Sequence, residues 1–99
     1  MGKPKRMWPR HEVAEFVRLL DAWRQSNGWG TYAFAHYLGI SGPYWSQLRE
    51  GWRTTGINVE AQAVARAPEP WRSALRAARQ ADFETLVRRE QAKAGEVLP

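Results

Sequence analysis

Residues 31–51 read Thr31-Tyr-Ala-Phe-Ala-His-Tyr-Leu-Gly-Ile-Ser-Gly-Pro-Tyr-Trp-Ser-Gln-Leu-Arg-Glu-Gly51, which predicts two short helices joined by one tight turn. The first helix, over about 31–38, carries Phe34, Ala35 and Leu38 at the spacing of a single apolar face. Gly39 is expected to end it, because glycine readily adopts the left-handed conformation found at many helix C-termini.

The second helix is expected over about 42–52. Ser41 is a natural N-cap, and a proline fits the first turn, where its missing N–H is not needed. Trp45, Leu48 and Trp52 recur at i, i+3 and i+7, which turns them toward the first helix. The outward face then consists of Pro43, Tyr44, Gln47 and Glu50.

Residues 31–53 resemble the phage-repressor (Cro/cI-like, or XRE) helix-turn-helix family. The family pattern L-A-x-x-L-G-[IV]-S-x-x-x-[hydrophobic]-S-x-[hydrophobic]-E-x-G-x-R aligns without a gap. Where the family usually has a glutamate after its second core position, this chain has Arg49. The matching residues are Phe34-Ala35, Leu38-Gly39-Ile40-Ser41, Trp45-Ser46, Leu48, Gly51 and Arg53.

The resemblance implies that the second helix enters the major groove of duplex DNA. The family's base contacts would fall on Gly42, Pro43, Tyr44 and Gln47. Of these, Gln47 is expected to read sequence, because its amide can pair bidentately with adenine. Phosphate contacts, which fix register but specify little, are assigned to Thr31, Ser41, Ser46, Arg49 and Arg53. Arg49 has an alternative, an ion pair with an acid of a neighbouring helix.

A helix, a glycine turn and a second helix also occur in many helical domains that never contact DNA. The alternative function is a small helical adaptor for protein–protein interaction, or an antitoxin, without DNA binding of its own. The combination of Gly39, Ser41, apolar residues in register and a basic charge balance favours DNA.

The composition is that of a single folded module. The chain has 99 residues, 43% of them hydrophobic, a net charge of +5 and no cysteine. An excess of positive charge is typical of proteins that bind polyanions. No run is long and apolar enough for a membrane span or signal peptide. We therefore expect a soluble, cytoplasmic protein, and an excess of arginine over lysine favours a bacterial source.

Three regions are expected along the chain. Residues 1–8 form a basic, flexible arm, in which Lys3, Lys5 and Arg6 are candidates for phosphate contact. Residues 9–67 form the helix-turn-helix core, and residues 68–99 form a C-terminal helical segment with a short tail.

The fold class is all-α, with five or six helices around the central motif. Pro9 is expected to open the first helix, which ends near Gly28. Asn58 caps a helix through Ala67 whose Ala61, Val64 and Ala65 face inward. From Trp71 to about Lys93 the chain forms one long helix or two, because the apolar phase slips near 80–82 and Asp82 could cap a sixth helix.

The apolar residues of the C-terminal segment either complete the monomer core or pair with a second copy. We favour a homodimer, because one recognition helix reads few base pairs and two, about 34 Å apart, read a palindrome. The candidate interface residues are Trp71, Leu75, Ala78, Phe83, Leu86 and Val87.

The sequence contains no recognisable catalytic or cofactor-binding motif, so the protein is not expected to be an enzyme. His11 and His36 are the only histidines, and no second ligand stands at metal-binding spacing from His36. Glu12, Glu15 and Asp21 are expected to form a solvated helix face. Neither a metal, a cofactor nor a small-molecule ligand is predicted.

Overall fold

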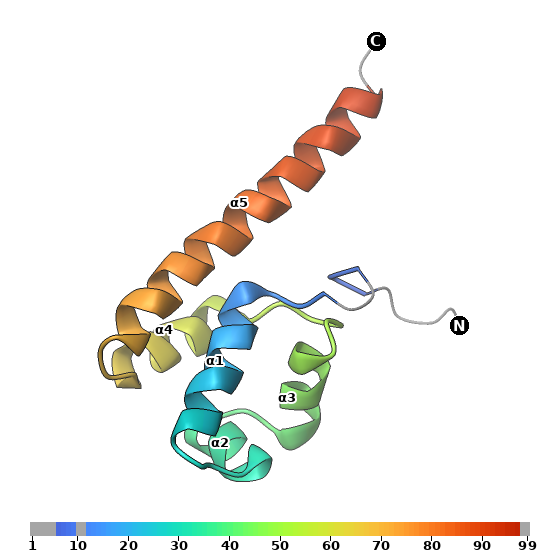
Figure 1. Ribbon diagram of the computed structural model, residues 1–99. Coiled ribbons are helices and arrows are strands. Elements are labelled where there is room, and N and C mark those ends of the chain that lie inside the picture. Colours follow the sequence, from blue (N-terminus) through green and yellow to red (C-terminus); the bar gives the residue numbers. More distant parts are fainter. Residues whose placement is uncertain (1–5, 10–11, 98–99) are drawn as a thin grey trace.

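The computed structural model describes residues 6–9 and 12–97, and its fold in these ranges is all-α, with five helices and no strand (Figure 1). The helices α1 to α4 form a globule against the first half of the long α5, whose second half projects away from them. None of the described helices has the length and apolar character needed to cross a bilayer. The bounds are α1 (Glu15–Ser26), α2 (Thr31–Tyr37), α3 (Gly42–Arg49), α4 (Ile57–Arg66) and α5 (Trp71–Val97).

The start of α1 differs from the prediction, because the helix begins at Glu15 and not at Pro9. The N-cap residue, Ala14, has no side chain that could cap the first turn. The carboxylate of Asp82 on α5 accepts hydrogen bonds from the backbone N–H groups of Glu15 and Phe16, at 2.7 and 3.0 Å. Orphan N–H groups at a helix start need such an acceptor, so α1 begins where α5 supplies one.

The corner between α2 and α3 forms as predicted. Gly39 has a φ of +74°, and the N–H groups of Gly39 and Ile40 donate to the carbonyls of His36 and Ala35. This pair of bonds is the Schellman motif that closes many helices. Ser41 then caps α3, its Oγ accepting from the backbone N–H of Tyr44 at 3.1 Å.

The helix α3 ends at Arg49, three residues before the predicted end. Gly51, with a φ of +84°, and Trp52 donate to the carbonyls of Leu48 and Gln47, a second Schellman motif. Trp52 therefore lies in the following loop, half-buried, and does not face the first helix from inside α3. A glycine with positive φ thus ends α3, at Gly51, as Gly39 ends α2.

The helix α4 has a different cap and a different buried face from those predicted. Gly56 is the N-cap, and Asn58 lies within the first turn without capping it. Ala63 and Ala67 are buried, whereas Ala61 and Ala65 are exposed and Val64 is half-buried. The small side chains of Ala63 and Ala67 let α4 lie close to α5, beside an ion pair between α4 and α5 residues Glu60 and Arg79; this contact sets which face turns inward.

The helix α5 is continuous, without the predicted break near 80–82. Leu75, Ala78, Asp82 and Leu86 form one regular stripe at intervals of three, four and four residues, and all four are buried or half-buried. Asp82 is thus the polar member of this stripe and not the cap of a sixth helix. Leu75 and Ala78 belong to the same core as the motif helices.

Candidate nucleic-acid interface

The helix α3 is seated by its inner face. Trp45 and Leu48 are completely buried, and the ring of Trp45 lies 5.3 Å from that of Phe34 on α2. The stack continues from Phe34 to Trp23 of α1, at 5.5 Å. Since aromatic rings bury large areas and pack in defined orientations, this cluster holds α3 at a fixed angle to α1 and α2.

The outer face of α3 is accessible. Pro43 is exposed, and Gly42, Tyr44 and Gln47 are half-exposed. Arg53, which follows the helix, donates from Nε to Oε1 of Gln47, and its guanidinium lies 5.9 Å from the ring centre of Tyr44. We call the group formed by Gly42, Pro43, Tyr44, Gln47 and Arg53 the reading surface.

The geometry of the reading surface suits hydrogen bonding to a flat polar edge. The Gln47 amide keeps its two N–H donors and one lone pair of its oxygen after the bond from Arg53. Arg53 also retains its terminal guanidinium nitrogens as donors, which match phosphate oxygens. The surface therefore offers an amide flanked by a cation.

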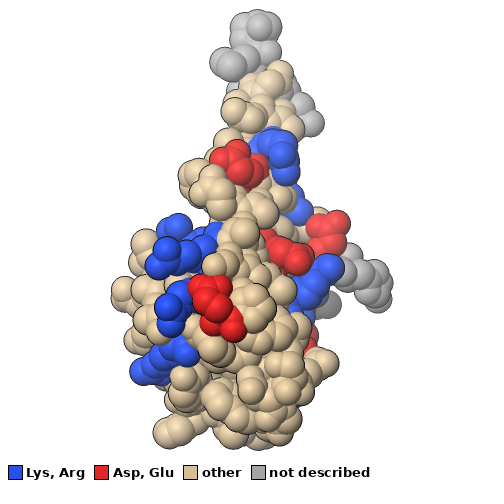
Figure 2. Space-filling model, turned by 60° about the vertical axis from the view of Figure 1, so that its left-hand side comes forward, with Lys and Arg blue, Asp and Glu red and all other residues tan. Residues whose placement is uncertain are grey.

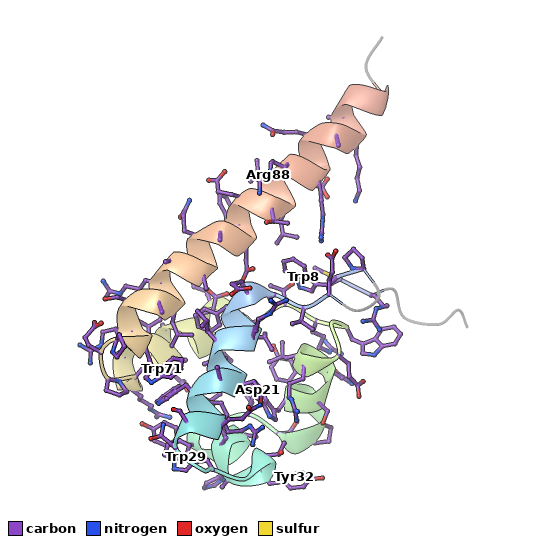
Figure 3. All side chains as sticks on the ribbon, in the orientation of Figure 1. Trp8, Asp21, Trp29, Tyr32, Trp71 and Arg88 are labelled. Atoms are coloured by element: carbon purple, nitrogen blue, oxygen red, sulfur yellow. The ribbon has the colours of Figure 1, made fainter. Side chains whose placement is uncertain are left out.

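At the start of α3, a side chain that the sequence analysis did not single out lies against the reading surface. Tyr32 of α2 is exposed, and its ring packs over Gly42, where a Cβ would lie 2.5 and 2.6 Å from ring carbons Cε1 and Cδ1. Figure 3 shows Tyr32 at the end of the molecule where α2 and α3 meet. Its outward helical phase, opposite Phe34 and Leu38, was the signal available in the sequence.

Three predicted phosphate contacts remain accessible, since Thr31 is half-exposed and Ser41 and Ser46 are exposed. The Ser41 oxygen also caps α3, and its hydroxyl proton remains available to donate. Lys3 and Lys5 lie outside the described residues.

Two other arginines make contacts within the protein, and their assignment to phosphate stays a prediction. Arg49 pairs with Asp21 of α1 at 3.6 Å, the alternative left open by the sequence. Arg6 donates to the Glu50 carbonyl, and its guanidinium stacks 4.8 Å from the Trp52 ring centre. Both arginines hold the C-terminal end of α3; the sequence left open an acid of a neighbouring helix for Arg49 but offered no partner for Arg6.

The segment containing Arg6 packs across the end of α3 and is not a free arm up to residue 8. Trp8 is buried, its backbone N–H donates to the Gly51 carbonyl at 3.1 Å, and its indole N–H donates to Thr54. A Cβ on Gly51 would lie 2.5 Å from the Glu12 carbonyl oxygen. We call residues 6–8 the strap; it fixes the end of α3 opposite to the Ser41 cap.

Positive charge is not concentrated on α3. Figure 2, which brings the α4–α5 side forward, shows lysine and arginine side chains along one edge of that face, with carboxylates beside them. Arg72, Arg76 and Arg79 of α5 are exposed, and Arg79 pairs with Glu60. Around the reading surface, Arg53 is therefore the main described cation available to a phosphate.

The predicted dimer residues separate into two groups. Leu75 and Ala78 are buried in the monomer core, and Trp71 and Leu86 pack against that core, which corrects the assignment of Leu75 and Ala78 to a subunit interface. Phe83 is 59% exposed and Val87 half-exposed. Phe83 and Leu86 border a hollow of about 290 Å³ between α4 and α5.

Among the described residues, no group of three or more His, Cys, Asp and Glu side chains is arranged to hold a metal ion. His36 is exposed on α2. A scan against protein-family models, a search of curated proteins and a search of solved structures each found no match to this chain. The functional interpretation therefore depends on the geometry of the reading surface and on the sequence resemblance.

Proposed function

We propose that the protein binds duplex DNA in a sequence-specific manner through α3 and acts as a transcriptional regulator. The observation that carries the proposal is the two-sided construction of α3. Its inner face is locked by Trp45 and Leu48, while Gln47 and Arg53 lie together on its accessible side. A helix held rigidly with polar side chains outward is what reading of the major groove requires.

In this proposal the side chains of the reading surface have different tasks. Gln47 contacts a base edge, with an adenine as its best partner. Arg53, Thr31 and Ser46 contact phosphates, which position the protein without specifying sequence. Tyr44 supports this arrangement, since its ring lies beneath the Arg53 guanidinium.

The regulator is proposed to be a repressor that occupies a palindromic operator as a homodimer, of the kind found on phages, plasmids and other mobile elements. Two copies would present two reading helices to successive turns of one DNA face. The exposed Phe83 and the half-exposed Val87, near the middle of α5, support a second copy at this helix.

We expect salt-dependent binding to DNA. In a gel-shift titration against sheared genomic DNA, affinity should fall steeply between low and physiological salt, because phosphate contacts release counterions. Fragments selected from a random duplex library should contain an inverted repeat, and sedimentation should report a dimer. Absence of binding at low salt would contradict the proposed function.

We also expect Gln47 and Arg53 to act differently. Gln47→Ala should weaken binding to the selected site by ~1 to 3 kcal/mol and relax the preference at one base pair. Arg53→Ala should weaken binding to all DNA sequences. The slope of log affinity against log salt concentration should fall by about one, because a phosphate contact is lost. Since Arg53 also donates to Gln47, some loss of preference at the Gln47 base pair should accompany it.

The control for Arg53 is Arg88→Ala, which removes the same charge from the projecting part of α5 (Figure 3). It should leave the preference at every base pair unchanged. If Gln47→Ala leaves the ranking of operator variants as it is, Gln47 is not a base-reading residue.

A second candidate function is a protein-interaction adaptor, or an antitoxin without DNA binding of its own. The exposed Phe83 beside the hollow between α4 and α5, together with the projecting second half of α5, favours a protein partner at that helix. The salt titration separates the two functions, because an adaptor would show no salt-dependent affinity for DNA.

A further inference from the structure

Tyr32 and Gly42 form one packed unit at the start of α3. Tyr32 is 78% exposed, yet its ring edge lies so close to Gly42 that no Cβ fits between them. Cβ atoms essentially never lie within 3.0 Å of another heavy atom, so a Cβ at position 42 would displace the ring. Glycine at this position therefore leaves space for the Tyr32 ring against the tip of α3.

The first two residues of α3 have no polar side-chain atoms. Gly42 and Pro43 carry none, and the backbone N–H of Tyr44 is already bonded to Ser41. The Tyr32 hydroxyl, which can donate and accept a hydrogen bond, is carried by a ring that lies against this tip. Tyrosine also has only two side-chain torsions, so ordering it on a ligand costs little entropy.

We propose that Tyr32 is a specificity-determining residue that contacts a base edge beside the one read by Gln47, and that Gly42 is required to position its ring. This inference rests on the proposed DNA binding and adds a second helix to it. A side chain of α2 would then contact DNA at the tip of α3. Gly42 would not contact a base itself but would support the ring of Tyr32.

The test measures binding to the site selected by the unaltered chain and to its single base-pair variants. Tyr32→Phe should lower affinity for the selected site roughly tenfold and weaken discrimination at one base pair other than the Gln47 pair. Gly42→Ala should weaken discrimination at that same base pair, because the new Cβ displaces the ring. Circular dichroism melting would verify that each variant is folded.

The double variant makes the test sharper. Once Tyr32→Ala has removed the ring, a Cβ at position 42 has nothing to displace, so adding Gly42→Ala should cost no further affinity. The matched control is Tyr37→Phe, which removes a hydroxyl from the same helix, from a ring packed on Trp23 and Trp29. Tyr37→Phe should leave the affinity for the selected site and the ranking of its base-pair variants unchanged.

Each outcome has a distinct meaning. If Tyr32→Phe leaves the ranking of base-pair variants unchanged while Gln47→Ala alters it, the role of Tyr32 is overturned and DNA binding through α3 stands. If the costs of Tyr32→Ala and Gly42→Ala simply add, the positioning role of Gly42 is overturned. If the unaltered chain shows no salt-dependent affinity for DNA, the proposed function and this inference both fail.

Discussion

Replacing Trp45 with alanine is expected to lower the free energy of unfolding by about 3 to 5 kcal/mol, as for other large aromatic side chains removed from a core. Trp45 is fully buried and links α3 to the ring of Phe34. Small domains are stable by only about 5 to 15 kcal/mol, so this variant should be largely unfolded under mild denaturing conditions. Chemical denaturation followed by circular dichroism measures the change.

The matched variant is Trp45→Phe, which keeps an aromatic ring at the same position. Among the residues that the structure describes, the indole N–H of Trp45 has no hydrogen-bond partner, so replacement by phenylalanine breaks no described hydrogen bond. Its cost should be well below that of alanine, about 1 to 2 kcal/mol for the lost volume. If alanine and phenylalanine cost the same, packing at Trp45 is not what seats α3.

Asp82→Ala is expected to have the second largest effect on stability, about 2 to 4 kcal/mol. The substitution leaves two backbone N–H groups, those of Glu15 and Phe16, without their acceptor at the start of α1. A buried donor left without a partner costs about 1 to 3 kcal/mol. Denaturant unfolding measures the loss, and α1 should fray first in amide hydrogen exchange.

The control for Asp82 is Glu84→Ala, two residues later on the same helix, where the side chain is exposed and accepts a hydrogen bond from exposed Gln80. It should change the free energy of unfolding by less than about 0.5 kcal/mol, as is usual for surface substitutions. Equal effects at Asp82 and Glu84 would mean that α1 does not depend on the cap from α5.

The stability also depends on pH through Asp82. Burial raises the pKa of its carboxyl above the ordinary value of 3.8, opposed by the hydrogen bonds from Phe16 and Glu15 and assisted by the Glu15 charge. The carboxyl of Asp82 therefore binds its proton more tightly in the folded chain than in the unfolded chain. The stability that this difference contributes is complete below pH 3.8 and is lost as pH rises through the raised pKa. The stability of the unaltered chain relative to Asp82→Asn should fall across that range.

Local signals in the sequence were sufficient for the corner between α2 and α3. Gly39 and Ser41 act through bonds to residues at most five positions away, so a short window contains the whole cause. The outward positions of Pro43 and Gln47 followed from helical phase alone, and the structure agrees. This part of the candidate site was predictable for that reason.

The errors have distant causes. The start of α1 depends on Asp82, which is 67 residues from Glu15 in the chain, and no local pattern reports such a cap. The partner of Arg6, the Glu50 carbonyl, belongs to a distant segment that the sequence did not indicate, whereas Asp21, the partner of Arg49, is an acid of a neighbouring helix, the alternative that the sequence left open. The closeness of Tyr32 and Gly42 likewise depends on the angle between two helices, which the sequence does not state.

The strap connects the N-terminal part of the chain to the segment that follows α3. Proteolytic trimming through Trp8 would remove the bond to the Gly51 carbonyl, the guanidinium stacked on Trp52 and the indole bond to Thr54. Arg53 lies between Trp52 and Thr54 in the chain, so its hydrogen bond to Gln47 would weaken as well. If α3 binds DNA as we propose, a peptidase acting at the amino terminus would weaken that binding without cleaving α3.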